Sequence, residues 1–382
     1  MKKYNFDNLI NRRNTSSCKW DVKDHELPMW VADMDFAVLP EITKAIKDRA
    51  DVSAFGYVSC AQEYFFSYAS WWNKYHHIDL NPKDMIYCTG VVAAIDSIFK
   101  HVLPPHSGVI IQSPVYHVFF NCVNNNGHIL LNNQLIEKDN EYSINFAELE
   151  KLLSQDNTKV LLLCNPHNPV GRIWNKEELS KIVQLCDKYN VLIISDEIHC
   201  DIVEPGYEYT PILSITNNAV SLISPSKAFN IAGIQAACIV CPNKDLFDVI
   251  EKGVGQDDVG EPNYFSTSAT IAAYTYGDRW IKEMNEYVFN NKKYFIDFIN
   301  KEIPQLKVVD NKATYLLWVN ISSFSKDSKL FCDDLRKKTG LFVSPGSQFG
   351  PGGETYFRIN VATSLNNVKD ACNRLKEYIK IR

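Results

Sequence analysis

The stretch Ala219–Lys227 reads AVSLISPSK: five residues typical of a buried strand, then a Ser-Pro-Ser turn and a lysine. An apolar run followed at once by a polar or turn-forming motif recurs in Val109–Pro114 (VIIQSP), Val160–Pro166 (VLLLCNP) and Val191–Glu197 (VLIISDE). Helical patterns lie between the runs, for example Lys176–Tyr189, for which Asn175 is the expected N-cap. Apolar strands that alternate with helices predict an α/β fold, with a mostly parallel mixed sheet between helices.

The C-terminal part follows a different pattern. Gly277–Glu302 is predicted to form one long helix that ends before Pro304, and shorter strand-like and helix-like segments alternate after it. This mixture predicts a smaller α+β domain. We therefore expect a large domain over residues 46–285 and a small domain built from residues 1–45 and 286–382.

Composition excludes several classes of protein. The chain has 382 residues, 22% of them charged, and a net charge of −5, with no cluster of Lys and Arg that suits nucleic acid. Its 11 cysteines are odd in number and scattered, which does not suit a disulfide framework. No apolar run suits a signal peptide or a bilayer span. We expect a cytoplasmic enzyme without a membrane or nucleic-acid partner.

Polar residues follow the predicted strands, where parallel sheets bind their ligands. Asn168 comes after the run that ends at Cys164, Asp196 follows the next run, and Lys227 closes the stretch quoted first. A fourth strand leads into residues 89–92 (TGVV), which are predicted to open a helix. We expect an amide, a carboxylate, an amine and a helix N-terminus to meet at one edge of the sheet.

These groups have defined tasks if the ligand is pyridoxal 5′-phosphate. Lys227 binds the cofactor covalently through its amine and later carries the proton of the substrate α-carbon. Asp196 keeps the pyridine nitrogen protonated, because only a pyridinium is a strong electron sink. Asn168 donates to the phenolate oxygen, and Tyr116 offers an aromatic face to the ring. The phosphate is expected to bind the backbone N–H groups of the helix N-terminus, at Gly90, Val91 and Val92. The hydroxyls of Ser224 and Ser226 are expected to complete its site. The predicted substrate is an amino acid.

Several motifs carry a resemblance to a known family. They are Trp30–Phe36 (WVADMDF), Phe55–Tyr57 (FGY), Ser113–His117 (SPVYH), Asn165–Pro169 (NPHNP), Ser195–His199 (SDEIH), Ser224–Gly233 (SPSKAFNIAG) and Phe357–Asn360 (FRIN). With these motifs the chain resembles fold type I pyridoxal-phosphate enzymes of the class I/II aminotransferase superfamily. Within that superfamily it is most similar to the MalY/PatB-type cystathionine β-lyase branch of C–S lyases. The motifs extend across almost the whole chain.

The resemblance implies two further roles and an assembly. Arg358 is expected to bind the substrate α-carboxylate, a bidentate task that suits a guanidinium group. A structural salt bridge is the alternative role for this arginine. Tyr57 is expected to reach the cofactor phosphate of a neighbouring subunit, because the family is homodimeric with its active site at the subunit boundary.

Two positions depart from the commoner aminotransferase pattern. His199, expected near the cofactor, stands where that pattern has tyrosine, and Gln235 stands where it has a phosphate-binding arginine. Both replacements are familiar in the β-lyase branch and favour elimination over amino transfer. We therefore predict a C–S β-lyase that converts L-cystathionine or a related sulfur amino acid into a thiol, pyruvate and ammonia. An aminotransferase and a regulatory binding protein that retains the fold are the alternatives.

Two motifs that could suggest metal binding are assigned to structure instead. Cys238 and Cys241 have no second pair at zinc spacing, and positions three apart in a strand face opposite ways. His76 and His77 end a predicted amphipathic helix, and we expect them on the surface. The sequence thus predicts no metal site.

Overall fold

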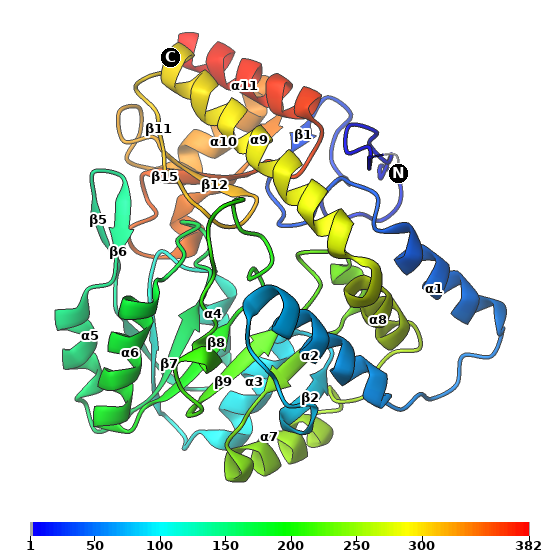
Figure 1. Ribbon diagram of the computed structural model, residues 1–382. Coiled ribbons are helices and arrows are strands. Elements are labelled where there is room, and N and C mark those ends of the chain that lie inside the picture. Colours follow the sequence, from blue (N-terminus) through cyan, green and yellow to red (C-terminus); the bar gives the residue numbers. More distant parts are fainter. Residues whose placement is uncertain (1–2, 382) are drawn as a thin grey trace.

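A large mixed sheet forms the centre of the protein, whose computed structural model describes residues 3–381 (Figure 1). Its strands follow the order β2-β10-β9-β8-β7-β3-β4. Their bounds are β2 (Met85–Cys88), β3 (Gly108–Ile111), β4 (Ile129–Asn132), β7 (Thr158–Cys164), β8 (Leu192–Asp196), β9 (Ala219–Ile223) and β10 (Ala237–Val240). The pairs from β9 to β4 are parallel, whereas β10 is antiparallel to both β9 and β2. The predicted α/β fold with a mostly parallel mixed sheet is therefore confirmed.

Helices cover both faces of this sheet. The helices on one face are α2 (Gln62–His76), α5 (Phe146–Leu153), α6 (Lys176–Tyr189) and α8 (Ser266–Tyr276), and those on the other are α3 (Val91–Val102), α4 (Val118–Asn125) and α7 (Lys244–Gln256). Leu161 and Leu163 of β7 face the first set, while Val160 and Leu162 face the second. Because both faces are buried, the strands are apolar throughout rather than alternating.

Helix α6 shows that local chemistry sets the bounds of an element. The Asn175 side chain accepts from Glu178 N at 2.8 Å, and the Glu178 carboxylate accepts from Asn175 N at 2.9 Å. This capping box satisfies two backbone donors that the helix itself leaves without partners. The helix predicted over Lys176–Tyr189 is confirmed at both ends.

A four-stranded antiparallel sheet lies at the other end of the molecule (Figure 1). Its order is β11-β12-β15-β14, with bounds β11 (Lys307–Val308), β12 (Leu316–Asn320), β14 (Ser344–Pro345) and β15 (Tyr356–Asn360). The helices beside it are α9 (Asp278–Glu302), α10 (Ser328–Thr339) and α11 (Leu365–Lys380). Helix α9 joins both parts, because Trp280 and Met284 pack into a core of the large sheet, while Phe295 and Ile299 pack into that of the small sheet. The division into domains at residues 45 and 285 stays a prediction.

The remaining elements are short or lie near the N-terminus. They are β1 (Leu27–Pro28), which pairs with β13 (Leu341–Phe342), α1 (Pro40–Asp51), the hairpin of β5 (Ile136–Lys138) and β6 (Glu141–Ser143), and the 3₁₀ turns η1 (Pro82–Asp84), η2 (Ile212–Ser214), η3 (Ala232–Ile234) and η4 (Gly346–Phe349). Across residues 3–381, none of the helices combines the length and the apolar character that crossing a bilayer requires.

Residues 30–36 connect the small sheet with the large one. Asn360 of β15 donates from Nδ2 to the carbonyls of Val31 and Asp33, each at 2.6 Å. Asn230, in the turn after β9, accepts from Met34 N at 2.9 Å. Two asparagines from distant parts of the chain thus fix this segment beside Lys227.

Candidate active site

A cavity of about 480 Å³ lies beyond the carboxyl ends of β7, β8 and β9. The N-terminus of α3, the segment around Ala32, and β15 complete its wall. The structure brings together all the predicted site residues except Tyr57, namely Gly90, Val91, Val92, Tyr116, Asn168, Asp196, His199, Ser224, Ser226, Lys227 and Arg358. These residues come from six separate segments of the chain, so no single motif is enough to predict that they meet.

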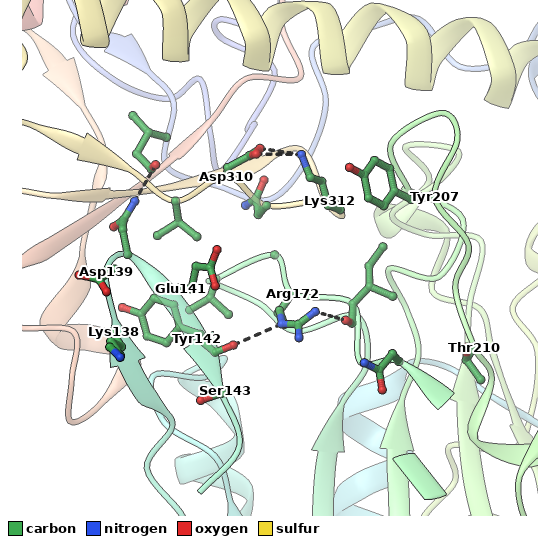
Figure 2. Close-up of a pocket in the computed structure, with 18 of the residues that line it drawn as sticks. Lys138, Asp139, Glu141, Tyr142, Ser143, Arg172, Tyr207, Thr210, Asp310 and Lys312 are labelled. Atoms are coloured by element: carbon green, nitrogen blue, oxygen red, sulfur yellow. Dashed lines mark hydrogen bonds and ion pairs between the residues drawn. The ribbon is translucent and has the colours of Figure 1, made fainter. Parts of the chain in front are cut away.

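A larger cavity, of about 1010 Å³, lies elsewhere (Figure 2). It lies between the hairpin β5–β6, the turn at Arg172, the loop of Tyr207 and the segment that holds Lys312. Two of its basic side chains already have acidic partners, since Arg172 pairs with Glu178 at 3.1 Å and Lys312 with Asp310 at 2.9 Å. None of the predicted catalytic residues lines it. We therefore place the candidate active site in the smaller cavity.

Lys227 lies in the turn after β9, and its amine points at the N-terminal segment. Nζ donates to Ala32 O at 2.8 Å. Burial lowers the pKa of Lys227 to about 8, and the positive charge of Arg358 acts in the same direction. The neutral form of the amine, which attacks an aldehyde or accepts a proton, is therefore accessible near neutral pH.

Asp196 is the last residue of β8, and His199 lies in the turn that follows this strand. Asp196 Oδ1 accepts from Ile198 N at 3.1 Å. Burial raises the pKa of Asp196 to about 7, so its charge lacks adequate compensation from the protein alone. Burial, aided by the positive charges of Lys227 and Arg358, lowers the pKa of His199 to about 3, which leaves its ring neutral. A cationic ring nitrogen near Asp196 would supply the missing compensation.

Arg358 reaches the cavity from β15 and is held by two acceptors. Nη1 donates to Asn168 Oδ1 at 3.1 Å, and Nη2 donates to Trp30 O at 2.9 Å. Its Nε is buried without a hydrogen-bond partner among residues 3–381. Within the described part of the chain, the hydrogen-bond acceptors of Arg358 are an amide and a carbonyl, and no carboxylate forms a salt bridge with it. The guanidinium charge is thus available to an anionic ligand.

The N-terminus of α3 has the features of an anion-binding site. Gly90 is its N-cap, no side chain caps the helix, and its first turn has no acidic residue. Helices α5, α6 and α7, by contrast, each begin with an asparagine side chain that accepts a backbone N–H. A side-chain carbon added at Gly90 would meet no atom within 4 Å, so the space before this turn is open. Free N–H groups and the helix dipole together suit a phosphate dianion.

Two serine hydroxyls and an aromatic ring complete the predicted set. Ser224 Oγ lies 2.8 Å from Ser226 Oγ, and both hydroxyls line the cavity. Burial raises the pKa of Tyr116, and the nearby negative charge of Asp196 raises it further. Tyr116 and Asp196 line the same cavity, and the stacking of the Tyr116 ring on the cofactor stays a prediction.

Sequence reasoning missed several polar residues of the cavity. They are Cys18, Trp30, Thr89, His117, Ser344 and Gln348. Trp30 and His117 belong to motifs already quoted for the family resemblance, so the sequence did offer a signal for them. Trp30 Nε1 and His117 Nδ1 have no hydrogen-bond partner in the described part of the chain. Cys18, Ser344 and Gln348 belong to no such motif, and only the fold brings them here. The unpartnered donors are candidates for contacts with the substrate.

Tyr57 lies on the surface instead. Its side chain is fully exposed, at 101%, and Phe55 beside it is 64% exposed. Exposed aromatic groups in one loop suit contact with another chain. The predicted contact with a neighbouring subunit stays a prediction.

The donors of the cavity fit pyridoxal phosphate. An accessible amine, a buried carboxylate that lacks a cation, and an uncapped helix N-terminus correspond to its aldehyde, its ring nitrogen and its phosphate. These are properties of Lys227, Asp196 and Gly90 in the structure and do not depend on any relative.

Comparison with known proteins agrees with this geometry. Residues 27–375 match the family model of class I and II aminotransferases. The chain belongs to the class I and II aminotransferase family. Proteins similar to the chain include both a cystathionine beta-lyase and an aspartate aminotransferase, so individual relatives are informative.

Three known proteins resemble the chain over nearly its whole length. Cystathionine beta-lyase PatB of Bacillus subtilis is 36% identical over 97% of this chain and 99% of its own. Cystalysin from Treponema denticola, solved with pyridoxal 5′-phosphate, superposes with a TM-score of 0.95 at 32% identity and covers 100% of both chains. A PLP-bound candidate aminotransferase from Clostridium difficile superposes with a TM-score of 0.96 at 34% identity, covering 99% of this chain and 100% of its own.

Proposed function

We propose that this protein is a pyridoxal-phosphate-dependent C–S β-lyase that acts on L-cystathionine or a related sulfur amino acid. With cystathionine and water, the products are homocysteine, pyruvate and ammonia. The observation that carries the proposal is the convergence of Lys227, Asp196 and Arg358 in one buried cavity. Similarity to PatB over the full length supports a lyase within the aminotransferase family.

The residues that would hold the cofactor follow from their chemistry. Lys227 would bind its aldehyde carbon, Asp196 would pair with its ring nitrogen, and Asn168 would donate to its ring oxygen from Nδ2. The N-terminus of α3 and the hydroxyls of Ser224 and Ser226 would hold its phosphate. When bound, pyridoxal phosphate withdraws electrons from the substrate α-carbon.

The protein then needs to hold the substrate and move one proton. Arg358 binds the α-carboxylate through its guanidinium, which its bonds to Asn168 and Trp30 already orient. Lys227 Nζ takes the proton from the α-carbon, and its lowered pKa favours the neutral base. Removal of this proton allows the bond from the β-carbon to sulfur to break, and the sulfur leaves as a thiolate.

A product assay distinguishes elimination from amino transfer. The protein is incubated with L-cystathionine, with and without a 2-oxo acid acceptor. A lyase releases homocysteine and pyruvate in equal amounts without the acceptor. Amino transfer to the acceptor that is much faster than thiol release would establish an aminotransferase instead, and no thiol from any sulfur amino acid tested would refute the lyase.

The attachment site has its own test. Borohydride reduction of the holoenzyme, followed by digestion and peptide mass analysis, is expected to place the cofactor mass on Lys227. A label on another lysine would overturn the site assignment even if lyase activity were found.

Two further statements belong to the same proposal. The protein is a homodimer in which Tyr57 reaches the cofactor phosphate of the other subunit, and the exposure of Tyr57 and Phe55 supports this. Its location is the cytoplasm, which the free state of all eleven cysteines supports. Light scattering tests the first statement and cell fractionation the second.

A further inference from the structure

Three side chains that commonly bind zinc meet outside the active site. His76 at the end of α2 lies against the turn after β8, with its Nε2 2.9 Å from Asp201 Oδ1. One ligand atom from each of His76, Cys200 and Asp201 lies within 4.8 Å of the others. The side chains of His76 and Asp201 are 6% and 3% exposed, and Cys200 is 3% exposed. The prediction that both histidines lie on the surface is therefore wrong for His76, because its ring turns inward.

We propose that His76, Cys200 and Asp201 bind a zinc-type divalent metal ion. An imidazole nitrogen, a thiolate and a carboxylate are the donors that zinc prefers. Bonds of about 2.0–2.3 Å place tetrahedral ligands roughly 3.3–3.7 Å apart, so the side chains need to close by about 1 Å. The metal replaces the hydrogen bond between His76 and Asp201, and the Cys200 thiol loses its proton to water as the sulfur–metal bond forms.

A separate cavity gives the ion access. Its volume is about 200 Å³, and His76, Cys200 and Asp201 all line it. Charges of both signs, from Glu208 and Lys282, line it as well. The cavity can hold a water molecule as a fourth ligand.

Outer hydrogen bonds keep Asp201 in place without help from His76. Trp71 Nε1 donates to Asp201 Oδ1 at 2.8 Å, and Asn285 Nδ2 donates to Asp201 O at 2.8 Å. Partners of this kind orient the ligands of metal sites. Asp201 therefore stays oriented when His76 turns to a metal.

The position of the site gives the ion a structural task. Cys200 and Asp201 directly follow His199 of the active-site cavity, whereas His76 is 125 positions away from Asp201 along the chain. A bound ion therefore clamps the end of α2 to the turn that carries His199. Because it binds only the folded chain in this geometry, it raises the midpoint of thermal unfolding.

Cobalt(II) is a suitable probe, because a cobalt–thiolate bond has a characteristic absorption. Holoenzyme treated with a chelator and dialysed is titrated with cobalt, and bound metal is measured by elemental analysis. We expect one ion per chain, a thiolate band, and a raised unfolding midpoint with zinc. Cys200→Ser is expected to abolish all three. Cys332→Ser is the matched control, because Cys332 is equally buried, at 4%, and lies in α10.

A second variant keeps the test decisive if Cys200→Ser folds poorly. His76→Gln keeps a polar side chain at this position, and it is expected to lower metal affinity at least tenfold while cofactor absorbance is retained. Equal metal binding by the wild type and His76→Gln, or a thiolate band that persists in Cys200→Ser, would overturn the proposal. Absence of bound metal in the wild type would do the same.

Discussion

Arg358 Nη1 donates to Asn168 Oδ1 at 3.1 Å, although the two residues are 190 positions apart. This bond joins the group assigned to the substrate carboxylate with the group assigned to the cofactor ring. Because Asn168 accepts from Arg358 through Oδ1, its Nδ2 is directed elsewhere and can donate to the cofactor. The two residues to which these binding roles are assigned therefore belong to one hydrogen-bond network.

Arg358→Lys tests the substrate half of this network. Lysine keeps the charge but loses the planar fork that bonds Asn168 and a carboxylate together. We expect kcat/KM to fall about 10- to 100-fold, equivalent to about 1.5–3 kcal/mol, mainly through a higher KM. Steady-state kinetics of thiol release measures this. Arg374→Lys in α11, remote from the cavity, is the control, and an equal loss there would point to a general effect on folding.

Asp196→Asn tests the electronic role of the carboxylate. Asparagine has the same shape but cannot balance a charged ring nitrogen. We expect the cofactor to remain bound and kcat to fall about 10²- to 10³-fold, a typical loss when one electrostatic contact in an active site is removed. The cofactor absorbance and single-turnover rates report on the two effects separately. A kcat close to the wild-type value would contradict the pairing of Asp196 with the ring nitrogen.

Gln235→Arg tests the phosphate site. Gln235 lines the cavity and has a φ of 56°. Arginine at this position would carry the same backbone strain as glutamine, so the substitution adds none. A new charge-assisted hydrogen bond to the phosphate is expected to lower the dissociation constant of the cofactor about tenfold. Such a bond contributes about 1.5–3 kcal/mol, and the loss of side-chain entropy offsets part of that gain. Titration of the apoenzyme with cofactor measures it. Gln235→Glu should weaken binding, and unchanged affinity in both variants would show that this side chain does not face the phosphate.

Lys292 provides a prediction about stability and pH. It is buried in α9, where Nζ donates to the carbonyls of Asn311, Ala313 and Thr314 at 3.0–3.4 Å. Burial lowers the pKa of Lys292 from its ordinary value of 10.5 to about 7. Between these two pH values the unfolded chain keeps a proton on this amine that the folded chain has released. Its contribution to the free energy of unfolding therefore rises with pH between about 7 and 10. Below that range the contribution stays at its low value.

The comparison of wild type with Lys292→Met isolates this effect. Met keeps most of the apolar stem but cannot titrate. The difference in thermal midpoint between the two proteins is expected to shift in favour of the wild type as the pH rises through this range. A difference that does not change with pH would show that the buried amine does not titrate there.

Local sequence predicted much of the fold. The apolar runs that became β7, β8 and β9 were visible because both faces of the sheet are buried. Helix α6 was placed to the residue because its capping box is a local feature. Asp196 and Lys227 could be singled out as candidates in a similar way, because each lies at or just after the end of a strand that is easy to recognise.

Other features could not be predicted from local patterns. The partner of Lys227 Nζ is the carbonyl of Ala32, 195 positions away. The sequence assigned His76 to the surface, because no local pattern indicates that its ring forms a hydrogen bond with Asp201, 125 positions away. Cys18 and Gln348 gave no signal for the same reason.

The sequence by itself determined the order of strands and helices, the residues at the strand ends and the chemistry that those residues offer. Periodicity, turns and caps act over a few residues, so the chain carries them wherever it folds. Only the tertiary structure decided that Asn168 bonds Arg358, that residues 30–32 line the cavity, and that His76 meets Cys200. These contacts depend on the docking of two sheets and an N-terminal segment, which is set by packing and hydrogen bonds between residues far apart in the chain.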